Sequence, residues 1–374
     1  MAFEPQIDFD KLEPLLDALE SARQDILALD VPPVLEPWLQ QFTEARGAHM
    51  STRIEGNPMT EEEVREAFAR PERGSGAAEL ENLNYRDAVR FAQEYANDPS
   101  ADIDGGFIRA LHFLIVREVD PYASGGRYRF EQNVVRSGAR DIYMPPPPTE
   151  VSRLMGALIA WLRASRGSVH PLVLAAVAHI ELVSIHPFDD GNGRAARALT
   201  SYFFDRGGWR LRDFVSAEQV FGQNIEAYYS ELGRVQGGRY LPQQTDLTGW
   251  VAWFLVTLQI EVLAVGGAAA GVGWYAGLRD ALTRQRIPGR LADGLTYIWL
   301  MRRVSRSEYA RAVGVSPATA ASDLGKLLAS GFVAREGRGP ATRYVSLERP
   351  FDEMIEGARI DAVSTLVERV EPQN

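Results

Sequence analysis

The segment His186–Arg197, with the sequence HPFDDGNGRAAR, is the most informative stretch of the chain about its fold. It joins two apolar stretches of helical periodicity, His170–Ile185 before it and a second one that extends through Phe203. Gly191 and Gly193 let backbone N–H groups approach an anion closely, and the N-terminus of the second helix adds the positive end of its dipole. The segment therefore predicts a phosphate-binding loop between two helices.

The charged residues of this segment support the same interpretation. Arg194 and Arg197 are three residues apart and share a helix face, where two cations cost about 0.3–1 kcal/mol each against the dipole. A polyphosphate reverses that cost, and Asp190 is suited to Mg²⁺, which binds carboxylates together with phosphate oxygens. The pKa of a histidine side chain is ordinarily near neutrality, which makes His186 a candidate general base. The alternative is a helix–turn–helix whose glycines serve only the turn.

The same twelve residues resemble the signature of the Fic family, HPFx(D/E)GNGRxxR, at every defined position. The resemblance extends over roughly Ser51 to Leu255. It implies a mostly helical domain that transfers AMP from ATP to a Ser, Thr or Tyr hydroxyl of a target protein and releases pyrophosphate. ATP, Mg²⁺ or Mn²⁺ and an unidentified target protein are the ligands that this activity requires.

The resemblance also implies a role for each residue of the loop. His186 takes the proton of the target hydroxyl, Asp190 binds the metal ion, and Phe188 packs inward to anchor the loop. The phosphate groups of ATP are held by Gly191, Asn192, Gly193, Arg194 and Arg197. The adenine is lined by Tyr229 and Gln236, the latter standing where some relatives have Asn.

A second motif lies upstream, where Ser51–Gly56 reads STRIEG and resembles the inhibitory motif (S/T)xxxE(G/N) of the same family. The resemblance implies that Glu55 pairs with Arg197 and occupies the site of the γ-phosphate. The plainer alternative is a surface helix capped by Ser51. Within the enzymes, a rival function is the removal of AMP from a modified protein, with Glu55 orienting the water.

The segment Tyr128–Tyr143 departs from helical periodicity and predicts a short β-hairpin. By resemblance it is the flap that pairs with a strand of the target protein. The flap residues are Val135, Arg136, Ser137, Gly138, Ala139 and Arg140.

Composition limits the class of protein. The chain has 374 residues, which favours two or three domains, and a net charge of −10. It has no cysteine, which excludes disulfides, thiolate metal sites and cysteine nucleophiles. The N-terminus has no signal-peptide pattern, and Trp250–Val272 is interrupted by polar residues, so we expect a cytoplasmic protein without a membrane span.

The C-terminal part differs in charge, with eleven basic and four acidic residues between Arg284 and Arg343. A winged helix is predicted here, with helices at Leu291–Arg302, Ser305–Val313 and from Ser316 to Ala329, and wing strands at Phe332–Arg335 and Thr342–Val345. Its third helix is expected to face outward with Thr319, Ser322, Asp323 and Lys326. Binding of DNA is one interpretation; protein contact or a homodimer is the other. A DNA-binding regulator that uses the Fic-like part as a sensor is the non-enzymatic alternative.

We therefore predict a mainly α protein, a Fic-type helical bundle with a small β-hairpin flap plus a C-terminal winged helix. The expected parts are an N-terminal helical region with the inhibitory motif, the catalytic core, a loose Gly/Ala-rich connection, the winged helix and a tail, at residues 1–100, 101–262, 263–284, 285–348 and 349–374. His112 and His179, within apolar helices, are expected to be structural.

Overall fold

A computed structural model describes residues 3–70, 72–119, 125–137, 140–211, 215–241, 246–284, 286 and 288–347. Gly138 and Ala139 of the predicted flap and the tail 349–374 lie outside the described residues.

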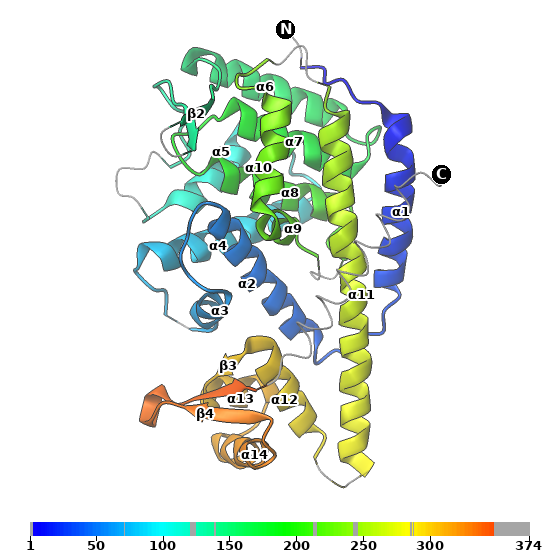
Figure 1. The fold of residues 1–374 in the computed structure, drawn as a ribbon, viewed down its shortest axis with the longest axis vertical. Helices are drawn as coiled ribbons and strands as arrows, with labels where there is room; N and C mark the ends of the chain where they lie inside the picture. Colours follow the sequence, from blue (N-terminus) through cyan, green and yellow to red (C-terminus); the bar gives the residue numbers. More distant parts are fainter. Residues whose placement is uncertain are drawn as a thin grey trace.

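The fold is mainly helical, as predicted (Figure 1). The helices are α1 Phe9–Leu27, α2 Glu36–Ile54, α3 Glu61–Ala69, α4 Ala77–Asn97, α5 Gly105–Val116, α6 Pro148–Ala164, α7 Pro171–Ile185, α8 Asn192–Arg206, α9 Ala217–Gln223, α10 Ile225–Gln236, α11 Thr248–Arg284, α12 Arg290–Met301, α13 Arg306–Val313 and α14 Pro317–Ala329. The strands are β1 Val135–Ser137, β2 Arg140–Tyr143, β3 Arg303–Val304, β4 Val333–Glu336 and β5 Arg343–Ser346, and η2 Gly339–Ala341 is a 3-10 turn.

The centre of the fold is the pair α7 and α8, which carry the loop His186–Arg197 between them. Nearly every residue of α7 is buried, because its sequence is apolar on all sides rather than on one stripe. Helices α4 and α5 cover α8, and α6 and α11 pack on α7. The loop is thus held between two helices that are themselves fixed in the core.

Helix α2 brings the upstream motif to this centre. Ser51 lies in the last part of α2 and is buried, so it is not a cap of a surface helix. The helix ends before Glu55, and Gly56 takes a φ of +89°, a left-handed conformation that suits glycine. The chain then enters α3, where Thr60 and Glu63 form a capping box.

The predicted hairpin is present but short. Strands β1 and β2 pair antiparallel, with Ser137 opposite Arg140. The hydroxyl of Tyr143 donates to the carbonyl of Ser184 at 2.6 Å, which attaches the hairpin to α7. The hairpin therefore lies beside the end of α7, where the loop begins.

Helix α11 corrects one prediction. The Gly/Ala-rich segment was expected to be a loose connection, but residues 248–284 form one helix that runs alongside α1 (Figure 1). Alanine is the best helix former and each glycine costs only about 1 kcal/mol, while Trp250 and Tyr275 anchor the two halves in the core. By length and composition the window Thr248–Val265 could cross a membrane, but 67% of it is buried in the protein, which favours a core helix.

The C-terminal part, α12 to β5, forms three helices and a three-stranded antiparallel sheet of order β3-β5-β4. Ser305 and Glu308 form a capping box on α13, and Gly314 ends that helix with a φ of +68°. Asp323 does not face outward as expected: its side chain is buried and pairs with Arg290 at 2.8 Å. Its burial removes the only acidic side chain from the exposed face of α14.

This part packs directly on the N-terminal helices (Figure 1). The rings of Trp38 in α2 and Tyr297 in α12 have centroids 5.2 Å apart. The buried side chain of Arg65 in α3 donates to the carbonyl of Leu300. Helix α2 therefore contacts the C-terminal part near its start and the central loop near its end.

Candidate active site

The backbone of the loop takes two left-handed conformations. His186 follows the last turn of α7 with a φ of +51°, and its N–H donates to the carbonyl of Leu182 at 3.0 Å. Gly191 precedes α8 with a φ of +75°, and a Cβ atom there would lie 3.1 Å from Val116. Glycine at 191 is thus required both by the turn and by the close approach of α5.

Two side chains fix the loop from inside. The side chain of Asn192 accepts a hydrogen bond from the N–H of Phe188 and donates to its carbonyl, both at 2.9 Å. Phe188 is buried, as expected, and stacks on His112 with ring centroids 3.7 Å apart. The Asn192 side chain thus forms its hydrogen bonds within the loop, and contact of Asn192 with phosphate stays a prediction.

His112 joins the loop to α5 by two hydrogen bonds. Its Nδ1 accepts from the N–H of Gly126 at 3.0 Å, so the ring proton is assigned to Nε2, which donates to the carbonyl of Asp190 at 2.8 Å. Burial lowers the pKa of His112 to about 4, which keeps it neutral in this role. The structural role expected for His112 is therefore one that supports the loop.

Arg129 is a site residue for which the sequence supplied no role. Only 2% of it is exposed, and its guanidinium donates to the carbonyls of His186 at 2.8 Å, Glu131 at 3.1 Å and Pro146. Its own N–H donates to the carbonyl of Pro187 at 2.9 Å. Arg129 thereby holds His186 to the segment that leads into the hairpin. The sequence offers no signal for this role, because an arginine that binds backbone carbonyls leaves no periodic pattern.

His186 is arranged as a base. Its Nδ1 lies 3.3 Å from the carbonyl of Val183, and a carbonyl only accepts, so the proton is assigned to Nδ1 and Nε2 keeps its lone pair. Burial lowers the pKa of His186, and the neighbouring Arg129 lowers it further, against the hydrogen bond to Val183. The imidazole is therefore neutral at physiological pH and able to take a proton at Nε2.

Arg197 is the buried cation of the site. Its Nε donates to the hydroxyl of Ser51 at 2.8 Å, and its Nη2 donates to the carbonyl of Ser51 at 3.0 Å and to the carboxylate of Glu55 at 2.7 Å. The structure thus places the upstream motif on Arg197, as the resemblance implies. Its Nη1 is buried without a hydrogen-bond partner among the described residues.

Glu55 lies over the start of α8. A Cβ atom on Gly193 would collide with the Glu55 carboxylate and would lie 3.1 Å from Nη1 of Arg197. About a third of the Glu55 side chain, 32%, remains exposed to solvent. The carboxylate therefore fills the space between solvent and the unpaired donor of Arg197.

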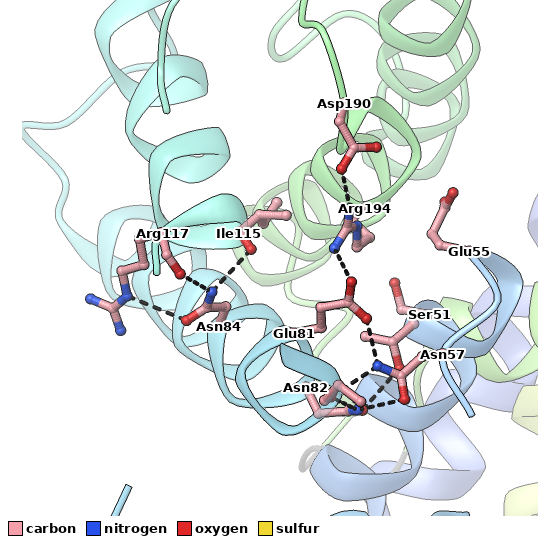
Figure 2. Close-up of polar contacts among 12 residues, drawn as sticks. Ser51, Glu55, Asn57, Glu81, Asn82, Asn84, Ile115, Arg117, Asp190 and Arg194 are labelled. Carbon is pink, nitrogen blue, oxygen red and sulfur yellow. Dashed lines mark hydrogen bonds and ion pairs between the residues drawn. The ribbon is translucent and has the colours of Figure 1, made fainter. Parts of the chain in front are cut away.

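Arg194 is also connected to the upstream motif, but indirectly. Figure 2 shows its guanidinium between Asp190, at 2.8 Å, and Glu81 of α4, at 3.6 Å. Glu81 accepts from the side chain of Asn57 at 2.5 Å, one residue after Gly56. Both loop arginines are thus held by contacts that lead back to the end of α2.

Asp190 is the predicted carboxylate ligand for a metal ion here. No group of three metal-ligating side chains occurs among the residues that the structure describes. The Asp190 side chain is 77% exposed, and its one hydrogen-bond donor within the described part of the chain is Arg194. One exposed carboxylate fits Mg²⁺, which keeps several waters and binds through one or two carboxylates plus phosphates.

The two residues expected around adenine both lie in α10, Tyr229 in its first half and Gln236 as its last residue. Tyr229 is 45% exposed, and its hydroxyl donates to the carbonyl of Ile54 at 3.2 Å, next to Glu55. Gln236 donates to the hydroxyl of Ser184 at 3.3 Å, two residues before His186. Both therefore border the loop, and contact with adenine remains a prediction.

We predict a pH dependence of stability from His179, beneath the loop. Its Nε2 lies 2.9 Å from the hydroxyl of Tyr228, and burial lowers its pKa to about 3. The unfolded chain, with a pKa of about 6.5, binds the extra proton, so the free energy of unfolding falls as pH drops below about 6.5. The slope due to His179 is about 1.4 kcal/mol per pH unit. Urea unfolding between about pH 7 and pH 5 should show a shallower pH dependence in His179→Gln than in the wild type. Equal slopes would contradict the buried neutral state.

The sequence of this chain is similar to that of known proteins. Residues 102–204 match the model of the Fic/DOC family. Over 201 residues the chain is 30% identical to "Protein adenylyltransferase Fic" of Nematostella vectensis. The aligned region covers 52% of this chain and 45% of that protein. Over 163 residues it is 34% identical to the protein of the same name from Drosophila melanogaster, covering 42% of this chain and 32% of that one. The matched segments thus span less than half the length of these relatives.

Solved structures agree on the fold. A Fic family protein from Desulfovibrio desulfuricans superposes with a TM-score of 0.58 at 23% identity, covering 92% of this chain and 98% of that one. A Fic domain containing signaling protein from Bacteroides thetaiotaomicron has a TM-score of 0.57 at 22% identity, covering 69% of this chain and 97% of that one.

Proposed function

Since residues 102–204 form a Fic/DOC family domain, we propose that this protein transfers AMP from ATP to a hydroxyl group of a target protein. The relatives at 30–34% identity carry the name protein adenylyltransferase, which supports this activity. In the step, the target oxygen attacks the α-phosphorus and the bond from that phosphorus to the pyrophosphate oxygen breaks. Pyrophosphate leaves, and Nε2 of His186 takes the hydroxyl proton.

The observation that carries the proposal is the meeting of His186 and Arg197 at one loop. A neutral imidazole with a free Nε2 stands at one end, and a buried guanidinium with an unpaired Nη1 stands at the other. Between them lie the first amides of α8, whose dipole favours an anion. A base, a set of anion donors and an exposed carboxylate are the groups that nucleotidyl transfer requires.

A divalent cation, when bound, would neutralise charge on the phosphates. Asp190 is the residue of the loop that would hold it. To do so, its carboxylate would share or give up the contact with Arg194. Arg194 would then be available to a phosphate group.

The target protein would reach the site along the hairpin. In the described chain β1 and β2 pair as strands only with each other, but Met144, directly after β2, forms a parallel bridge with Arg239. The outer edge of β1 is therefore the edge that would accept an extended segment. The bond from Tyr143 to Ser184 keeps the hairpin next to His186. The flap role of Val135 to Arg140 remains part of this proposal.

We also propose that Glu55 restrains the transfer. Its carboxylate uses the Nη2 donor of Arg197 at 2.7 Å and repels a phosphate that approaches the same guanidinium. Charge-assisted hydrogen bonds of this kind contribute about 1.5–3 kcal/mol each, so their loss changes productive binding of ATP about tenfold or more. Removal of AMP from a modified protein is the second candidate function, because the exposed part of Glu55 could orient a water there.

The first test is the base. In His186→Ala, transfer from α-labelled ATP to protein should be lost, while ATP still binds because the loop amides and arginines are unchanged. Labelling measures the transfer and calorimetry measures the binding. Self-labelling at the wild-type rate would remove His186 from the mechanism.

The second test is the restraint. Glu55→Gly should raise self-labelling at least about tenfold, and Glu55→Gln should raise it less, because the amide removes the charge but still fills the space. Time courses of both variants and the wild type provide the measurement. An unchanged rate in Glu55→Gly, with faster loss of AMP from pre-labelled protein in the wild type, would favour the removal reaction.

A second proposed function concerns α12 to β5, which we propose to be a winged helix that binds duplex DNA. The specific support is the exposed face of α14, where Ser322 and Lys326 are exposed while Asp323 is buried against Arg290. Arg335 and Arg338 are exposed on and beside β4. Protein contact, including a homodimer, is the competing use of this face.

The test is binding to a mixed-sequence duplex at several salt concentrations. If Lys326, Arg335 and Arg338 contact phosphates, replacing all three by Ala should reduce the slope of log K against log salt by about 2.7, at about 0.9 per contact. Replacing three exposed arginines elsewhere, Arg53, Arg127 and Arg136, is the matched control. If the protein binds no duplex even at low salt, the result would contradict DNA binding and favour protein contact as the use of this face.

A further inference from the structure

A cavity of about 430 Å³ lies outside the loop His186–Arg197. Its walls come from α2, α4, α8 and the segment that enters α9, and no residue of the loop lines it. This volume falls within the range of about 300–1,000 Å³ typical of small-molecule sites. Charged and amide side chains are among the residues that line it.

One wall of this cavity holds a buried carboxylate without a cation. Glu218 is only 4% exposed. Its Oε1 accepts from the hydroxyl of Tyr85 at 2.5 Å and its Oε2 accepts from the hydroxyl of Ser216 at 2.6 Å. No Lys, Arg or His nitrogen of the described chain forms an ion pair with it. A buried carboxylate that meets only neutral donors is costly, and each oxygen still has a lone pair to offer.

The other charges of the cavity already have partners. Arg90 forms two hydrogen bonds with Glu44. Arg86 pairs with Asp87 at 3.0 Å, and Arg210 lies 3.7 Å from Asp205. An anion would have to displace these carboxylates from their arginines, whereas a cation at Glu218 displaces nothing. The lining therefore selects the sign of a ligand.

We propose that this cavity binds a small organic cation, an alkylammonium or guanidinium compound, with its charged nitrogen on the carboxylate of Glu218. The side chains of Gln40, Gln93 and Thr43 line the same space and supply hydrogen bonds to the remainder of the ligand. Val89 and Phe204 supply apolar contact for its methylene groups.

The cavity lies one side chain away from the arginine of the loop. Burial raises the pKa of Tyr85, Glu218 raises it further, and the nearby Arg197 and Ser51 lower it. Tyr85, which lines the cavity and bonds Glu218, is therefore within electrostatic reach of Arg197. Helix α2 forms another wall, and a Cβ on its Gly47 would come within 2.9 Å of the Ser216 hydroxyl. A ligand here would touch the helix that carries Glu55.

The experiment is calorimetric titration of the full chain with 1,4-diaminobutane and with agmatine, and with 1,4-butanediol as the uncharged control. Both cations should bind saturably below about 10 mM, and at least about tenfold more tightly than the diol. Glu218→Gln keeps a group that can bond Tyr85 and Ser216 but removes the charge, and should weaken the cations at least about tenfold. Glu226→Gln, an exposed glutamate on α10, should leave them unchanged.

Three results would overturn the proposal. They are no saturable binding of either cation up to about 10 mM, equal binding of the diol, and undiminished cation binding in Glu218→Gln. If the thermal transition shows that Glu218→Gln does not fold, the proposal is tested by comparing the binding of the cations and of the diol to the wild type. Because binding is measured directly, the outcome does not depend on whether the protein transfers AMP.

Discussion

The buried guanidinium of Arg197 is the charge around which the site is organised. Only 1% of the residue is exposed, so its charge must be matched by groups of the protein or of a ligand. In the structure this match is made by Ser51 and Glu55 from α2, a segment more than a hundred residues away in the sequence. An incoming phosphate would compete with Glu55 for the same donors, which links nucleotide binding to the position of α2.

Helix α2 connects three parts of the molecule. Its start packs on the C-terminal part through Trp38 and Tyr297, its middle forms a wall of the cavity beside Glu218 through Gly47, and its end places Glu55 on Arg197. These three contacts lie along a single helix.

The sequence predicted the features that depend on local chemistry. The hairpin and the loop between α7 and α8 follow from turn residues and periodicity, and the family match confirms the resemblance for residues 102–204. Prediction from sequence failed where tertiary contacts decide the structure. The glycines of α11 stay helical because both halves of that helix are anchored in the core, and Asp323 is buried because it pairs with Arg290. The carbonyl contacts of Arg129 and the loop contacts of Asn192 leave no pattern that spacing could reveal.

The central claim is that Glu55 occupies the place of the terminal phosphate on Arg197, with His186 facing the α-phosphorus. A crystal structure of Glu55→Gly with a non-hydrolysable ATP analogue and Mg²⁺ tests it most directly. The account predicts a γ-phosphate oxygen within hydrogen-bond distance of the Arg197 guanidinium and the α-phosphorus opposite Nε2 of His186. A nucleotide bound elsewhere, or one whose phosphates avoid Arg197 although Glu55 is absent, would contradict it.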